Sequence, residues 1–191
     1  MKTHIGNFRI SISVYFAAII TFALIFSPDA GALTVLLSCI FHEAGHLAAI
    51  KIFGGKANGI SLGAYGMRID ADYGMKLSPL KEAAVCAAGP AVNIILAVWG
   101  IICKNRFLVS VNISLAVINL IPAGKTDGYN GLYCLISALS DCNDPSPILK
   151  RISIVFIAAA YTAGIIIFLK SGFNFSLLAA AVYMTLLSLK E

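Results

Sequence analysis

Apolar residues gather along this chain in long runs that are separated by short polar segments. A helix that crosses a membrane needs about 20 mainly apolar residues. Five runs stand out, at about 10–27, 31–54, 82–103, 152–169 and 175–189. A further apolar stretch at 107–140 is interrupted by proline, glycine and charged residues, and we interpret it as one broken span rather than two short ones. The pattern predicts an all-α integral membrane protein with six transmembrane segments, the fourth of them broken.

The polar segment at about 55–80 follows a different pattern. Between residues 65 and 73, apolar positions alternate with glycine and charged positions, which is the period of a strand with one apolar face. Ile60 and Leu62 indicate a short strand before it, so the sequence predicts a β-hairpin after the second transmembrane segment. The hairpin either lies on the membrane or pairs with an extended substrate through the strand that carries Tyr65, Met67 and Ile69.

Composition supports a membrane protein of one domain. The 191 residues are 59% hydrophobic and 12% charged, with a mean hydropathy of +0.89, whereas soluble domains have about 25% charged residues. We expect a single membrane-embedded domain over 1–191, with its core at about 31–140 and the remaining helices as scaffold. The net charge of +5 comes without a basic cluster beside aromatic residues, so nucleic acid is not an expected partner.

The lysines and arginines predict the orientation in the membrane. If the N-terminus is cytoplasmic, ten of them face the cytoplasm, three face outside and Lys125 lies within the broken segment. Cytoplasmic loops are enriched in these residues. We therefore expect both termini to be cytoplasmic, in a bacterial cytoplasmic membrane.

A metal-binding motif lies inside the second apolar run. The sequence from His42 to His46 reads H-E-x-x-H, and residues four apart share one face of a helix. Both imidazoles can therefore bind one metal ion, while Glu43 can take a proton from a water that the metal activates. Ionisable side chains at membrane depth are costly and are usually kept for a function. The motif predicts a hydrolytic zinc site in the cytoplasmic half of the membrane.

A third ligand has to come from elsewhere, because a catalytic zinc site normally has three protein ligands and one open position. Of the nine acidic residues, only Glu43 and Asp127 fall within apolar spanning sequence. Asp127 follows a proline and precedes a glycine, and irregular backbone at membrane depth is tolerated where it lines a cavity or is buried in protein. Asp127 is therefore the predicted third ligand. Cys39, three residues before His42 on the same helical face, is the alternative.

The motifs resemble those of the site-2 protease family of intramembrane zinc metalloproteases, in particular its compact branch typified by stage IV sporulation protein FB. Three elements carry the resemblance, namely His42-Glu43-x-x-His46, Gly89-Pro90-x-x-Asn93, and Asn119-x-x-Pro122 followed by Asp127-Gly128. The resemblance implies one zinc ion per chain, held by His42, His46 and Asp127, with Glu43 as the catalytic residue. The chain departs from the family pattern at Lys125-Thr126 and at Tyr129.

Two asparagines in these elements have open roles. Asn93 and Asn119 either form hydrogen bonds between helices or hold an unwound substrate or an oxyanion.

The sequence thus predicts an intramembrane zinc metalloendopeptidase that cleaves a transmembrane or membrane-associated protein. The resemblance to the sporulation branch implies the release of a signalling protein or transcription factor precursor. We expect a regulatory membrane partner to control this release. One alternative is a catalytically silent zinc-binding scaffold, although a purely structural zinc site has no need for Glu43 as a base. Another alternative, a metal transporter, would need polar residues along a path through the membrane, whereas the charges here converge at one depth.

Overall fold

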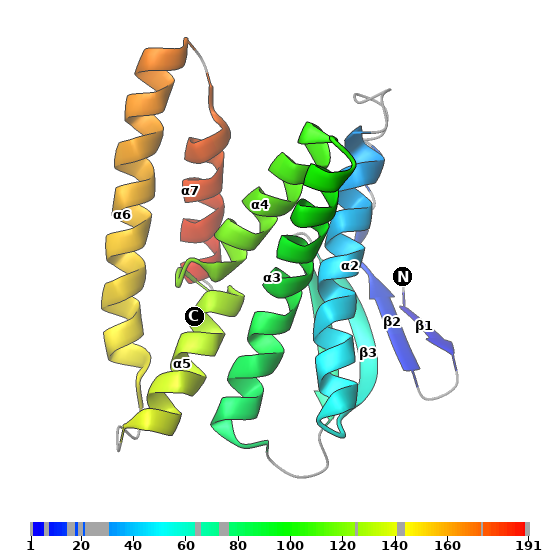
Figure 1. Cartoon of the computed structure of the whole chain (residues 1–191). Coiled ribbons are helices and arrows are strands. Elements are labelled where there is room, and N and C mark those ends of the chain that lie inside the picture. The colour runs from blue at the N-terminus through cyan, green and yellow to red at the C-terminus, as the bar shows by residue number, and fades with distance from the viewer. Residues whose placement is uncertain are drawn as a thin grey trace. The chain divides into compact units, whose positions relative to one another are not determined.

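The chain is described by a computed structural model in which α-helices predominate and four strands form one sheet (Figure 1). The structure describes residues 2–5, 8–14, 18, 21, 31–63, 66–72, 77–124, 126–140, 144–172 and 174–189. Two compact units can be distinguished. The first comprises Met1–Leu77 and Ala88–Ala116, and the second comprises Ser78–Ala87 and Val117–Glu191. Helix α3, Pro79–Ile102, contributes to both.

Helix α2, Gly31–Ile52, belongs to the first unit and coincides with the second apolar run. Its end is defined by a glycine. The N–H groups of Gly54 and Gly55 donate to the carbonyls of Lys51 and Ile50 over 3.0 and 2.8 Å, and Gly54 has a φ of 82°. This Schellman arrangement needs a left-handed residue, which glycine supplies without a steric cost. The chain can therefore leave the helix where the apolar run ends.

The sheet also belongs to the first unit. Its strands are β1 (Lys2–Ile5), β2 (Phe8–Ile12), β3 (Lys56–Gly63) and β4 (Gly66–Asp72), in that order. β3 and β4 are antiparallel and form the predicted hairpin, with Ile60 opposite Ile69 and Leu62 opposite Met67. Tyr65 lies outside the described residues.

Strands β1 and β2 correct two predictions. The protein is not all-α with a hairpin alone, because β2 pairs in parallel with β3 and extends the sheet. Residues 10–12 of the predicted first transmembrane helix, 10–27, belong to β2. Between Phe8 and Ile12, apolar residues alternate with polar ones, a strand period that a long apolar window averages out. Of the later positions in 10–27, the structure describes Ser13 as irregular and Val14, Ala18 and Thr21 as helical.

The predicted interruption within 107–140 is confirmed. Helix α4, Arg106–Leu120, ends just before Pro122, and helix α5, Asp127–Leu139, begins after it. Proline has no N–H group for a helical hydrogen bond, and the residue before it is disfavoured in the helical conformation. Asp127 therefore becomes the first residue of a new helix instead of an interior position.

The second unit also contains a long helix, α6 (Ser146–Ser171), which contacts α5, and a shorter helix, α7 (Ser176–Ser188). Helices α6 and α7 pack side by side and are coloured yellow to orange and red in Figure 1. The Tyr161 hydroxyl lies 3.2 Å from Oγ1 of Thr185 and links them. The Ser153 hydroxyl donates to the carbonyl of Pro122 over 2.7 Å. This bond connects α6 to the segment that precedes Asp127.

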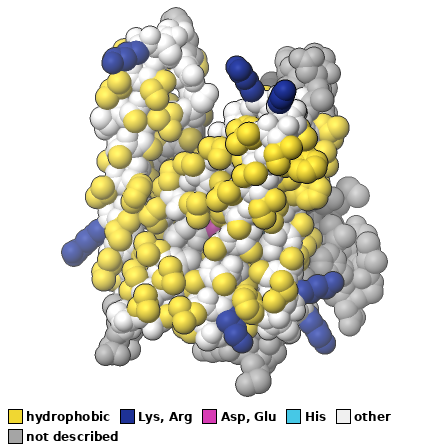
Figure 2. Space-filling model, in the orientation of Figure 1, with side chains coloured by type: hydrophobic (Ala, Val, Ile, Leu, Met, Phe, Trp, Pro, Cys, Tyr) yellow, Lys and Arg dark blue, Asp and Glu magenta, His cyan; other side chains and the backbone are white. Residues whose placement is uncertain are grey.

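The helix surfaces indicate a membrane environment. Among the described residues, three helices are long and apolar enough to cross a membrane, namely α2, α3 and α6. Helix α6 leaves Ile154, Val155 and Leu169 between 65% and 74% exposed, and Figure 2 shows hydrophobic side chains across the visible face. Apolar surface of this extent marks contact with lipid or a partner. Together with the composition, it identifies an integral membrane protein.

The count of six transmembrane segments stays a prediction. The run at 175–189 forms α7, which has 13 residues. At a rise of about 1.5 Å per residue this helix is roughly 20 Å long, less than the hydrocarbon core of about 30 Å. Helix α4 is also among the shorter apolar helices.

Candidate metal centre

The two histidines of the H-E-x-x-H motif face one another on α2. His42 and His46 are 6% and 8% exposed, and their Nε2 atoms lie 3.2 Å apart. Two nitrogen ligands at about 2.0–2.1 Å from one tetrahedral zinc ion would be separated by about 3.3 Å. The pair therefore has the spacing that a shared zinc ion requires.

Helix α3 leaves space beside both ring nitrogens. At Gly89, a Cβ atom would lie 2.7 Å from Nε2 of His42 and even closer to Nε2 of His46. No real side chain fits at such distances. The glycine of the G-P-x-x-N element thus keeps a volume open next to the two lone pairs that a metal would use.

Asp127 is positioned by a cap at the start of α5. The Thr126 hydroxyl accepts a hydrogen bond from the N–H of Tyr129 over 3.3 Å and donates to the carbonyl of Ile121 over 2.6 Å. Threonine is a favoured N-cap because it satisfies an N–H group that lacks a helical partner. Thr126, one of the departures from the family pattern, thereby fixes the turn that presents Asp127.

The Thr126→Val substitution is expected to lower the free energy of unfolding by about 1 kcal/mol, because valine keeps the shape but loses both hydrogen bonds. Thermal unfolding in detergent, compared with Thr126→Ser, measures the effect. Serine keeps the hydroxyl and should unfold close to the wild type. Equal stability of the valine variant and the wild type would contradict the capping role.

A cavity of about 280 Å³ adjoins Asp127 within the second unit. Its lining is mostly small or apolar, and it consists of Ala83, Cys86, Ala87, Leu120, Pro122, Asp127, Gly128, Gly131, Leu132 and Leu135. Apolar cavities with few polar groups are typical of binding sites. The carboxylate of Asp127 is the one acidic group in this lining.

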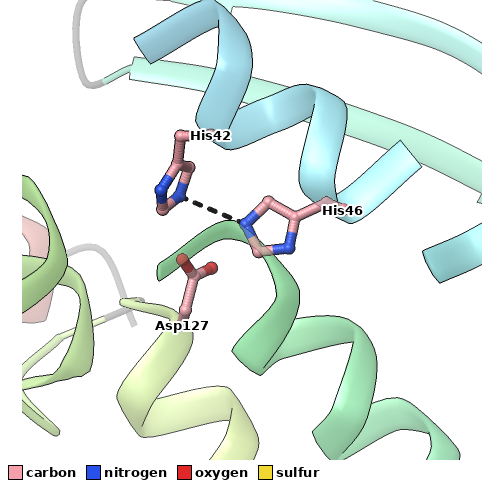
Figure 3. A group of neighbouring side chains, drawn as sticks. All are labelled: His42, His46 and Asp127. Carbon is pink, nitrogen blue, oxygen red and sulfur yellow. Dashed lines mark hydrogen bonds between the residues drawn. The ribbon is translucent and has the colours of Figure 1, made fainter. Parts of the chain in front are cut away.

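The three predicted ligands form one group. His42, His46 and Asp127 each offer one ligand atom, and these atoms lie within 4.8 Å of one another (Figure 3). Two imidazole nitrogens and one carboxylate oxygen are a donor set that catalytic zinc sites use, with a position left for water. The residues present therefore fit a zinc ion. Cys39, the alternative third ligand, is not a member of this group.

The other predicted site residues have distinct positions. Glu43 is half-buried on α2, next to His42. Asn93 is completely buried on α3, where its side-chain oxygen faces Nδ1 of His42. Asn119 is half-buried in the last turn of α4. Met67 and Ile69 lie in β4, at one end of the described sheet.

Two buried polar residues near the histidines are not among the residues predicted from the sequence. Ser38 and Asn112 are 2% and 0% exposed, and they are joined by a side-chain hydrogen bond of 3.0 Å. Ser38 precedes His42 by four residues and so shares its helical face, which is a signal that the sequence contains. Asn112 lies in an apolar run outside any motif, and only the fold brings it here.

Comparison with known proteins identifies a similar solved structure. The sequence matches no protein-family model and no curated protein. Its structure is similar to that of the site-2 protease from Methanocaldococcus jannaschii, with a TM-score of 0.68 and 21% sequence identity, over 100% of this chain and 94% of the other. The likeness to the sporulation branch stays a prediction. The chain has the fold of a site-2 protease.

Proposed function

We propose that this protein is an intramembrane zinc metalloendopeptidase. The observation that carries the proposal is the group of His42, His46 and Asp127 in a site-2 protease fold, with both histidines on an apolar helix long enough to cross a membrane. The similar solved structure is named a protease, which supports the same activity here. One zinc ion per chain, held by these three side chains, is part of the proposal.

The chain's own residues would divide the chemistry between them. When bound, zinc would lower the pKa of a coordinated water to about 7 and polarise the scissile carbonyl. Glu43 accepts the proton of the attacking water and then donates it to the leaving amine, so that the proton is returned when the peptide bond breaks. The three ligands would hold the metal and are not chemically altered in the reaction, namely His42, His46 and Asp127. Glu43 is suited to this role by its position beside His42 on α2.

The proposed substrate is a transmembrane or membrane-associated protein. A transmembrane helix keeps its amides in hydrogen bonds, so the cleaved segment has to unwind first. The place of β4 at the end of the described strand order supports β-pairing with the unwound segment, through the strand that includes Met67 and Ile69. Cleavage would release a signalling protein or transcription factor precursor into the cytoplasm, under control of a regulatory membrane partner.

Zinc content tests the site. Detergent-purified wild-type protein is expected to contain about one zinc per chain, and Asp127→Ala should lower the affinity for zinc by at least about 100-fold. That factor is the upper end of what the loss of a supporting residue costs, and a lost ligand should cost no less. Elemental analysis and competition with a chelator measure both quantities.

Asp144→Ala is the matched control for this test. It removes a carboxylate whose Oδ1 accepts from the N–H of Ser146 over 3.0 Å at the start of α6, and it should leave zinc binding unchanged. Equal zinc affinity of Asp127→Ala and the wild type would exclude Asp127 as the third ligand and direct attention to Cys39. A wild type that cannot be loaded with zinc would overturn the proposal.

A further inference from the structure

Three polar side chains are buried together in the first unit, next to His42, the first histidine of the H-E-x-x-H motif. Ser38 on α2, Asn93 on α3 and Asn112 on α4 are each at most 2% exposed. A buried polar group is costly unless it is hydrogen-bonded. The three residues satisfy this need by bonding to one another and to His42.

The direction of every bond in this network follows from one backbone carbonyl. The carbonyl of Leu108 can only accept, so the group of Asn112 that lies 3.0 Å from it is the Nδ2 amide. Oδ1 of Asn112 therefore faces Asn93 and accepts from its Nδ2 over 2.9 Å. The same Nδ2 lies 3.4 Å from the carbonyl of Ser38, a second acceptor. Oδ1 of Asn93 is then left to face His42.

This orientation determines which nitrogen of His42 carries the hydrogen. An amide oxygen accepts only, so Nδ1 of His42 must donate to Asn93. A neutral imidazole has one protonated nitrogen. Nε2 of His42, the atom near Nε2 of His46 and Gly89, is therefore left with its lone pair.

We propose that Asn93, Asn112 and Ser38 are positioning residues that hold His42 in the tautomer able to bind metal through Nε2. Metal-ligating histidines commonly donate their other ring N–H to a partner that fixes the tautomer and the ring orientation. Here the direct partner is an asparagine amide, oriented in turn by a second asparagine on another helix. The importance of this network for zinc binding rests on the proposed function, whereas the tautomer itself can be tested in metal-free protein.

The first test is the tautomer of His42 in the wild type. The chain has three histidines, so nitrogen NMR of metal-free protein labelled at histidine, with His4→Gln and His46→Gln for assignment, resolves the ring of His42. The spectrum is recorded in mildly alkaline buffer. Nδ1 is expected to be protonated and Nε2 unprotonated. The opposite tautomer would overturn the proposal without any substitution in the network.

The second test is the effect of the network on zinc affinity. Asn93→Leu keeps the approximate size of the side chain but removes the acceptor, and it should mix the tautomers of His42 and weaken zinc binding about 10–100-fold. Asn93→Asp retains an acceptor for Nδ1 and should restore the tautomer and most of the affinity. Asn112→Leu leaves Asn93 in place but unoriented, so a smaller loss, about tenfold or less, is expected.

Thr185→Val separates positioning from a general loss of helix contacts. It removes the hydrogen bond between Tyr161 and Thr185 on α6 and α7, so it should reduce stability without altering the His42 tautomer or the zinc affinity. If Asn93→Leu resembles this control, with zinc bound as tightly as in the wild type, the network is merely structural and the proposal fails. If the wild type binds no zinc but His42 has the expected tautomer, the proposed function fails while the assignment of the network stands.

Discussion

Replacement of Glu43 by glutamine is expected to stop cleavage while zinc stays bound. The amide of glutamine matches the carboxylate in shape but cannot accept a proton from the attacking water. A positioned general base contributes about 10²- to 10⁴-fold to a rate, so residual cleavage should fall below 1% of wild type, a factor of about 10². Because Glu43 is not a member of the group formed by His42, His46 and Asp127, zinc content should remain near one per chain.

The measurement does not need a known substrate. Membranes that contain wild type or Glu43→Gln can be compared for new protein termini, and a panel of single-span fusions with a cytoplasmic reporter gives a direct count of released product. Glu82→Gln is the matched control, because Glu82 is a carboxylate on α3 that accepts from Sγ of Cys134 over 3.5 Å. It should leave cleavage unchanged.

Two results would alter the interpretation. Cleavage by Glu43→Gln at the wild-type rate would show that the base is another group. Zinc bound by a wild type that cleaves none of the panel and creates no new termini in membranes would favour the catalytically silent scaffold.

Replacement of Gly89 by alanine should have the second large effect, a loss of zinc binding without a loss of the fold. The new methyl group would occupy the volume beside Nε2 of His42 and His46, and the rings would have to turn away from it. Alanine is favoured over glycine inside a helix by about 0.5–1 kcal/mol. We therefore expect zinc affinity at least about 100-fold below wild type, comparable with the loss of a ligand, while α3 remains formed.

Zinc competition and thermal unfolding, measured side by side, check this prediction. Gly31→Ala is the control, since a Cβ atom there would meet the ring of Phe107 at an ordinary 3.4 Å, and it should keep its zinc. Wild-type affinity in Gly89→Ala would mean that the metal does not use the Nε2 atoms of His42 and His46. A variant that unfolds before losing zinc would show that Gly89 serves helix packing instead.

Predictions from the sequence were accurate where the deciding interactions are local. His42 and His46 share one face because they are four residues apart in a helix, whatever that helix packs against. A proline ends a helix because it has no backbone N–H group to donate. The alternation within the hairpin likewise predicted β3 and β4. The same rule, applied over a shorter window, would have identified β2, whose period was hidden by the longer apolar run that follows it.

By itself, the sequence determined the H-E-x-x-H helix, the hairpin, the interruption before Asp127 and the apolar character of the chain. Only the tertiary structure decided that β2 pairs in parallel with the hairpin, that Asn93 contacts His42, and that Asn112 contacts Asn93. The partners in these contacts are 51 residues apart for His42 and Asn93, and 74 apart for Ser38 and Asn112. No local period relates residues so distant. Whether such residues come into contact depends on which helix faces pack together. Each polar group that is buried by this packing needs a hydrogen-bonding partner.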